Sequence, residues 1–194
     1  MLPWDRATRP IAAAGYASLA AMVPTLRLAT PADIPAIQRV GLDADTRYLT
    51  VGRPELADDS TIPTDAAASA IARGALVVAD LDGEGVVGWI VVGRVGDELC
   101  VGQLSVATAF GRRGIGSALL ARVVADARAN AEPSLLLNTE ADVPWCRPWY
   151  ARRGFAVVPR DAWGPALAAL AAAQAEAGLD WSTRVHMRIK LRAD

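Results

Sequence analysis

The stretch that decides the fold runs from Leu104 to Asn130 and reads LSVATAFGRRGIGSALLARVVADARAN. It ends an alternating strand, passes through a glycine-rich turn and continues as an amphipathic helix over Ser117–Asn130. A helix N-terminus presents unpaired N–H groups and the positive end of the helix dipole, so it attracts anions. The glycines let the backbone approach a ligand closely, and Arg112 and Arg113 add positive charge. The stretch therefore predicts a site for a phosphate or pyrophosphate.

Two common phosphate-binding loops fit this turn poorly. A Walker A loop requires a lysine after its last glycine, but Ser117 follows Gly116 directly. A Rossmann loop requires a glycine where Leu119 stands, and its strand opens a βαβ unit. The strand here instead follows segments that read as hairpins. A nucleotide-binding module of either kind is therefore disfavoured.

The segments on either side predict a single α/β domain (α+β). Short turns between neighbouring strands favour a mixed, mostly antiparallel central sheet, and the amphipathic segments favour flanking helices on both faces. The polar stretch 43–64 reads as a loop or broken helix, and loops of this length usually have a function. We expect strands at 25–30, 75–81, 86–95, 98–106, 134–139, 155–158 and 185–191, and helices from 31, at 64–74, at 117–130, within 144–153 and at 163–178.

Composition excludes several classes of function. The chain has 194 residues, of which 53% are hydrophobic and 21% charged, so it is globular rather than disordered. A net charge of −1 gives no electrostatic footprint for nucleic acid or an acidic membrane surface. The single histidine, His186, excludes multi-histidine metal sites and leaves Ser-His-Asp or Cys-His catalysis only if it is itself the base. Cys100 and Cys146 are too few for a zinc motif or a disulfide framework, so we expect no metal.

The beginning of the chain has three open interpretations. Arg6 and Arg9 precede an apolar segment at 11–23, which resembles a weak signal peptide. Because alanine dominates this segment and Asp5 lies among its basic residues, we favour a short packing helix or an upstream start codon, with Met22 as a second candidate start. No apolar run reaches the roughly 18 residues of a membrane span. We expect residues 1–24 to form an N-terminal extension or helix and residues 25–194 the domain.

A second motif lies downstream of the turn, at Tyr150-Ala151-Arg152-Arg153-Gly154-Phe155. The two motifs, in this order, resemble the GNAT superfamily of acetyl-CoA-dependent N-acetyltransferases. Its members carry [QR]-x-x-G-x-[GA] at the turn and often end the active-site helix with Tyr and Gly-Phe. Here Gly111 stands at the Gln/Arg position. The stretch DVPWCRPWY also resembles a bacterial subset that reads VPWN-x-PFY, with Cys146 in place of the asparagine.

The resemblance covers about Leu26 to Leu191 and implies how the cofactor binds. Acetyl-CoA enters an opening beside the strand that precedes the turn. The backbone of Val106 donates to the thioester carbonyl, and Leu104 lines the pantetheine. The reaction is direct attack by a neutral amine. Backbone N–H groups of Arg112, Arg113, Gly114, Ile115, Gly116 and Ser117 hold the pyrophosphate.

The resemblance also places the catalytic groups. Tyr150 stands at the position of the proton donor to the departing thiolate, and a free tyrosine is protonated at neutral pH. Related enzymes often carry a glutamate on the strand before the turn, but Gly102 and Gln103 occupy that place. We favour Glu140 as the base, with a water chain to solvent as an equal alternative.

These expectations define an N-acetyltransferase acting on a primary amine of a small molecule or peptide. The alternative is a non-catalytic acyl-CoA-binding sensor or regulatory protein of the same fold. Use of CoA argues for the cytoplasm, and such folds commonly form homodimers; no nucleic-acid or membrane partner is expected. The polar loop is either simply solvated or selects a cationic amine through its acidic residues Asp43, Asp45, Glu55, Asp58 and Asp59.

Overall fold

The computed structural model describes residues 23–57 and 61–192. Their strands form one seven-stranded sheet in the order β1-β2-β3-β4-β5-β7-β6. All neighbouring strands are antiparallel except β4 and β5, whose connection passes through a helix. The strands are β1 (Thr25–Leu28), β2 (Leu76–Leu81), β3 (Gly85–Val95), β4 (Glu98–Val106), β5 (Ser134–Glu140), β6 (Ala156–Val157) and β7 (Arg184–Lys190).

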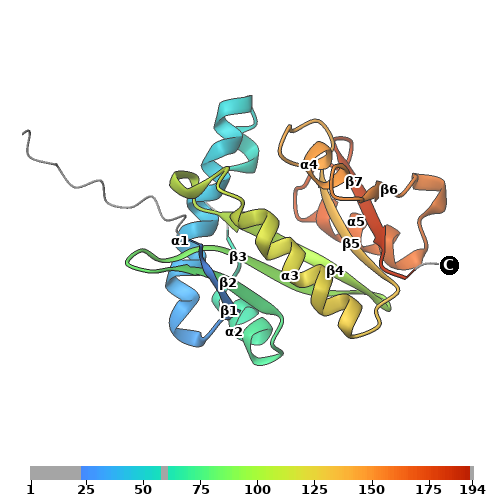
Figure 1. The fold of residues 1–194 in the computed structure, drawn as a ribbon. Helices are drawn as coiled ribbons and strands as arrows, with labels where there is room; N and C mark the ends of the chain where they lie inside the picture. The colour runs from blue at the N-terminus through green and yellow to red at the C-terminus, as the bar shows by residue number, and fades with distance from the viewer. Residues whose placement is uncertain (1–22, 58–60, 193–194) are drawn as a thin grey trace, which may run out of the picture.

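Helices cover both faces of the sheet, as Figure 1 shows for α3 on one face and α1 and α2 on the other. Alternation along the strands explains this, because successive side chains point to opposite faces. Val77 and Leu137 join the cluster under α3, whereas Val78 packs with α1 and Leu136 with α5. The helices are α1 (Ile34–Asp45), α2 (Thr64–Ala72), α3 (Ile115–Ala129), α4 (Arg147–Ala151) and α5 (Pro165–Glu176).

The sheet divides where β4 meets β5. Only Leu99–Val101 pair with Leu135–Leu137, and β4 then continues to Val106 without a partner on that side. The register against β3 also slips here, leaving Gly102 as the extra residue of a β-bulge that bends the strand. The second half of β4 therefore borders an opening between two halves of the molecule.

The predicted architecture is confirmed: the fold is mixed α/β with a mostly antiparallel sheet and helices on both faces. The main local difference lies in the polar stretch after α1. It is partly ordered as two short 3-10 helices, η2 (Thr46–Val51) and η3 (Pro54–Leu56), and Asp43 still belongs to α1. The expected N-terminal extension, residues 1–24, lies almost entirely outside the described residues.

Candidate active site

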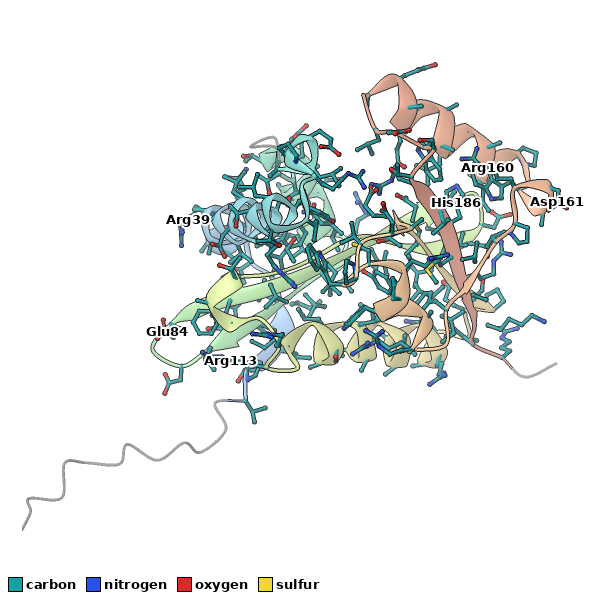
Figure 2. The ribbon with its side chains drawn as sticks, turned by 90° about the horizontal axis from the view of Figure 1, so that it is seen from above. Arg39, Glu84, Arg113, Arg160, Asp161 and His186 are labelled. Carbon is teal, nitrogen blue, oxygen red and sulfur yellow. The ribbon has the colours of Figure 1, made fainter. Side chains whose placement is uncertain are left out.

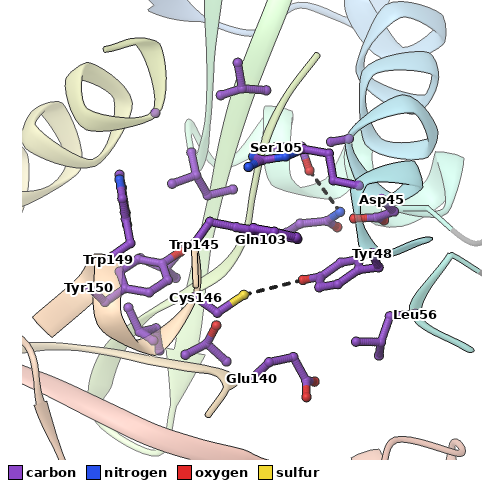
Figure 3. A pocket seen from close by; sticks show the side chains of 18 of the residues that line it. Asp45, Tyr48, Leu56, Gln103, Ser105, Glu140, Trp145, Cys146, Trp149 and Tyr150 are labelled. Carbon is purple, nitrogen blue, oxygen red and sulfur yellow. Dashed lines mark hydrogen bonds between the residues drawn. The ribbon is translucent and has the colours of Figure 1, made fainter. Parts of the chain in front are cut away.

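A cavity of about 680 Å³ occupies the opening beside the second half of β4. It runs from the glycine turn, past α4, to the η2–η3 segment and the start of β7, and Figure 3 shows its central part. Its lining brings together most of the predicted site residues: Leu104, Val106, Arg112, Gly114, Ile115, Gly116, Ser117, Glu140 and Tyr150.

Backbone donors of β4 face this cavity. The N–H of Ala107 donates to the carbonyl of Val87 at 2.9 Å, on the β3 side. Because N–H groups alternate along a strand, those of Val106 and Leu104 point away from β3, toward the opening left by β5. Val106 therefore presents an N–H group in the place where the resemblance expects a donor to a carbonyl.

The glycine turn exposes the first N–H groups of α3. Gly114, the N-cap, has a left-handed φ of 85°, and no side chain caps the helix. The first backbone hydrogen bond of α3 runs from Ala118 to Gly114, which leaves the amides of Ile115, Gly116 and Ser117 for a ligand. The arrangement suits an anion such as a diphosphate.

Gly116 leaves room for such a ligand. A Cβ atom built there would lie 3.6 Å from Val106, 3.8 Å from Trp149 and 3.9 Å from Leu104, all ordinary contacts. These three side chains therefore surround a channel at the helix start, and a larger side chain at Gly116 would fill it. The residues present fit a pantetheine diphosphate.

The two arginines of the turn differ in placement. Arg112 takes a left-handed φ of 59° and lines the cavity. Arg113 does not line it, because its guanidinium lies over the ring of Phe110, with the ring centre 5.2 Å away. The expected contact of Arg113 is thus restricted to its backbone N–H.

Arg153 supplies a positive charge that the sequence analysis did not assign. Its Nη2 donates to the Ser117 hydroxyl at 2.6 Å, and its guanidinium stacks on Trp149 at 3.6 Å from the ring centre. The Trp149 ring also lies near the start of α3, 3.8 Å from a Cβ atom built at Gly116. Arg153 thereby links α4 to the first turn of α3.

Tyr150 is half-buried on α4 and lines the cavity. Its ring packs edge-on against Trp149 and Phe155, with centres 4.9 and 5.7 Å apart. Burial raises the pKa of the Tyr150 phenol above its ordinary value, so the hydroxyl stays protonated. The predicted donor is therefore held in the protonated form beside the cavity.

A second phenol, Tyr48, enters the cavity from η2. Its hydroxyl lies 3.7 Å from the thiol of Cys146, and this contact crosses the cavity in Figure 3. Burial raises the pKa of both the phenol and the thiol. Cys146 is thus a buried, protonated thiol that joins the two halves of the molecule.

Glu140 lies at the far end of the cavity, in surroundings unlike those of a base. Its side chain is only 1% exposed. One carboxylate oxygen accepts from Arg53 at 3.1 Å and from Thr183 at 3.0 Å, and the other accepts from Arg184. We call Arg53, Glu140, Thr183 and Arg184 the Arg53 cluster. Since a base must reach the proton that it removes, an enclosed and occupied carboxylate suits a structural role better.

The other acidic candidates are dispersed. Asp43 accepts from the backbone and hydroxyl of Thr108 and so braces the segment before the glycine turn. Asp45 and Glu55 line the cavity, but Asp58 and Asp59 lie outside the described residues. Glu98 pairs with Arg188 at the opposite end of β4.

His186 lies apart from the cavity, on β7 in the half that carries α5 (Figure 2). It is 1% exposed, and its Nε2 lies 3.2 Å from the carbonyl of Leu167. Its ring packs between Trp163 and Trp181, at 4.6 and 4.5 Å between centres. The contacts are those of a core histidine.

Among residues 23–57 and 61–192, no group of three or more His, Cys, Asp or Glu side chains is arranged to hold a metal ion. The helices in the same ranges include none long and apolar enough to cross a membrane.

Comparison with known proteins gives a family and a fold. A family described as an acetyltransferase (GNAT) domain matches residues 72–157. The structure is similar to that of the PaiA N-acetyltransferase from Thermoplasma acidophilum in complex with coenzyme A. For that pair the TM-score is 0.65 at 14% identity, over 87% of this chain and 99% of that one.

Two further solved structures share the fold. N-acetylglutamate synthase from Neisseria gonorrhoeae, complexed with coenzyme A and N-acetyl-glutamate, has a TM-score of 0.65 at 17% identity over 87% of this chain. The match spans only 35% of the synthase. The ribosomal-protein-S18-alanine N-acetyltransferase from Escherichia coli has a TM-score of 0.60 at 15% identity, over 88% of this chain and 95% of that one.

Proposed function

Because this chain belongs to the GNAT acetyltransferase superfamily, we propose that it transfers an acetyl group from acetyl-CoA to a primary amine of a small molecule or peptide. The observation that carries the proposal is the cavity itself. It joins the uncapped first turn of α3, the free N–H groups of β4 and the Tyr150 phenol in one continuous space. We assign the activity to a domain spanning residues 25–194.

The chain's own residues divide the binding of acetyl-CoA between them. The amides that follow Gly114, together with Arg112, hold the diphosphate. Leu104 and Trp149 line the path of the pantetheine, and the Val106 N–H donates to the carbonyl of the thioester. Acetyl-CoA supplies the activated acetyl group. A backbone donor aimed at that carbonyl stabilises the negative charge that develops as the amine attacks.

Tyr150 acts on the leaving thiolate. Because the phenol pKa lies above that of a thiol, about 8.5, Tyr150 donates a hydrogen bond to the sulfur more readily than it gives up its proton. Stabilising the departing thiolate in this way requires only that the phenol remain protonated. Burial in the α4 aromatic cluster meets that requirement.

We route the proton of the amine to solvent through water rather than to Glu140. The Glu140 carboxylate already accepts from three side chains and exposes almost no surface to the cavity. Gln103 lines the cavity in the place of the family's glutamate and has no titratable group. Water that enters the cavity from solvent then carries the proton.

A non-catalytic acyl-CoA sensor is the second candidate. The observation that favours it is the absence, among the described residues of β4, of any carboxylate that lines the cavity. Such a protein would bind acetyl-CoA and release no CoA. On either reading we place the protein in the cytoplasm, where CoA is available, and homodimer formation is compatible with both.

The two candidates are separated by one assay. The protein is incubated with acetyl-CoA and a panel of small amines, polyamines, amino acids and short peptides, and the CoA thiol is measured by a chromogenic disulfide. Release that depends on an amine supports the transferase. Saturable binding of acetyl-CoA with no release from any amine favours the sensor, and no binding of acetyl-CoA contradicts both.

A further inference from the structure

The η2–η3 segment (Thr46–Leu56) is fastened to the opposite half of the molecule at two points. One lies at the start of α4, where the Tyr48 hydroxyl is 3.7 Å from the Cys146 thiol and the Arg47 guanidinium is 4.4 Å from the centre of the Trp145 ring. The other is the Arg53 cluster, in which Arg53 reaches β5 and the residue before β7. Both contacts cross the cavity from α1's side to the side of β5 and β7.

Arg53 makes most of this second connection. Its Nη2 donates to Glu140 at 3.1 Å and to Thr183 at 3.2 Å, and its Nη1 donates to Asp142 at 3.3 Å. Its side chain is 17% exposed and that of Glu140 is 1% exposed. A hydrogen-bonded ion pair this far from solvent couples its partners more strongly than the exposed pairs typical of protein surfaces.

The position of the segment decides what the cavity admits. Tyr48, Glu55 and Leu56 all line the cavity, as do Trp145 and Leu179. The ring centres of Tyr48 and Trp145 are 5.9 Å apart. The whole cavity measures about 680 Å³, and the acetyl-bearing arm of CoA must share it with the acceptor. The η2–η3 segment therefore forms part of the cavity wall, away from the glycine turn, at the end left for the acceptor.

We propose that Arg53 is a specificity-determining positioning residue. It holds the η2–η3 segment across the acceptor end of the cavity and so restricts the acceptor to a small amine that the cavity encloses. The restriction to small amines rests on the proposed transferase function, whereas the attachment of the η2–η3 segment through Arg53 does not. Arg184 and Thr183 keep the Glu140 carboxylate compensated when Arg53 is replaced, so the fold survives the substitution.

The fastening is tested with the chain's own thiols. Cys146 is 5% exposed and lies against the segment, whereas Cys100 is 6% exposed in the cluster under α5. The full chain is treated with N-ethylmaleimide, and modification of each cysteine is followed by peptide mass spectrometry. In Arg53→Met we expect Cys146 to react at least tenfold faster while the Cys100 rate, which reports wider unfolding, stays unchanged.

Two further variants control this result. Arg53→Lys keeps one positive donor near Glu140, so its Cys146 rate should fall between those of the parent and Arg53→Met. Arg94→Met removes an arginine paired with Glu132 at 2.8 Å, outside the cavity lining, and should leave both rates at parent values. An unchanged Cys146 rate in Arg53→Met overturns the fastening, as does a parallel rise at Cys100.

The selectivity is tested with the amines that the parent protein acetylates. In Arg53→Met, KM for a small amine should rise at least fivefold while KM for acetyl-CoA stays constant. The ratio of kcat/KM for a tripeptide to that for the small amine should also rise, and Arg53→Lys should restore part of the parent ratio. Faster labelling of Cys146 with no change in this ratio overturns the role in selectivity. A parent protein that acetylates no amine overturns the proposed function and, with it, the selectivity, while the labelling result still stands.

Discussion

At the scale of single residues, the cavity is governed by which polar groups remain available. Tyr150 keeps its proton because α4 buries it, and the described residues offer its hydroxyl no hydrogen-bond partner. Glu140, in contrast, has a full set of partners. Availability, more than residue type, therefore separates a group that can act on a substrate from one that holds the structure.

Replacing Tyr150 with Phe tests this distinction. Removing one hydrogen-bond donor to a charge that develops in the transition state typically costs about 10²- to 10³-fold in kcat, so we expect kcat to fall at least tenfold in Tyr150→Phe. The affinity for CoA should hardly change, because the ring and its packing remain. Steady-state release of CoA and calorimetric titration measure the two quantities. A kcat equal to that of the parent would reject the role of the hydroxyl.

Glu140→Gln gives the complementary result. A lost base would lower kcat and remove the ionisation of that base from the pH profile of kcat. We expect instead a loss of stability of about 3–5 kcal/mol or less, as when one partner of a buried ion pair is removed. Urea unfolding measures the loss of stability, and the pH dependence of kcat shows whether a base has been lost. A large fall in kcat in a variant as stable as the parent would identify Glu140 as the base.

His186 makes stability depend on pH. Burial lowers the pKa of the imidazole in the native state, while the unfolded chain titrates near 6.5. The native state thus binds fewer protons than the unfolded chain. The contribution of His186 to the free energy of unfolding is therefore complete above its pKa in the unfolded chain, and it is lost as pH falls toward its lower pKa in the native state. The free energy of unfolding should fall between about pH 7 and pH 5, and the fall should be smaller in His186→Gln. An equal fall in both proteins would assign the effect to other groups.

At the scale of elements, the start of α3 combines two needs in a few residues. The turn must reverse direction, which the left-handed φ of Gly114 allows, and it must leave its amides uncovered. Ile115 fixes the position of the turn, because its side chain is 3% exposed and anchors the first turn of α3 in the core. Gly116 has no side chain, so it leaves these amides uncovered and the channel beside them open.

Gly116 can be tested with a pair of variants. Gly116→Ala adds a Cβ atom with only ordinary contacts, the nearest at 3.6 Å, and should bind CoA. Gly116→Leu should fill the channel and bind no CoA at concentrations that saturate the parent. Calorimetric titration with CoA measures both, with circular dichroism confirming that each variant is folded. Binding by Gly116→Leu equal to that of the parent would place the diphosphate elsewhere.

The elements were predictable because their patterns are local. Alternation identified β4 from Glu98 to Val106 with the observed bounds, and the glycine turn located the start of α3 to within two residues. Tyr48 and Arg53 were missed because their roles depend on contacts with residues about ninety positions or more away along the chain. The local signals that this stretch had a function were its unusual length and its acidic residues.

At the scale of the whole molecule, the two halves are joined through a short parallel seam, and the cavity lies between them. A ligand that contacts Val106 on one half and α4 on the other bridges both. Binding to the native state alone then stabilises the entire fold by mass action.

Thermal unfolding measures this linkage. Acetyl-CoA at one hundred times its Kd should add about 2.7 kcal/mol, which for a protein of this size raises Tm by about 5–10 °C. Gly116→Leu should show no rise under the same conditions. A parent Tm that does not respond to acetyl-CoA would contradict binding between the halves.

The brevity of the β4–β5 seam has one more consequence. Only Leu99–Val101 and Leu135–Leu137 join β4 to β5, so the distance between Val106 and Tyr150 depends on how the two halves pack around this short pairing. Leu119 and Leu137 belong to the buried cluster that packs beneath α3. A substitution that removes a few methylene groups from this cluster would shift the Val106 N–H relative to the Tyr150 hydroxyl without contacting either residue. Substitutions in the core can therefore change kcat as much as substitutions in the cavity wall.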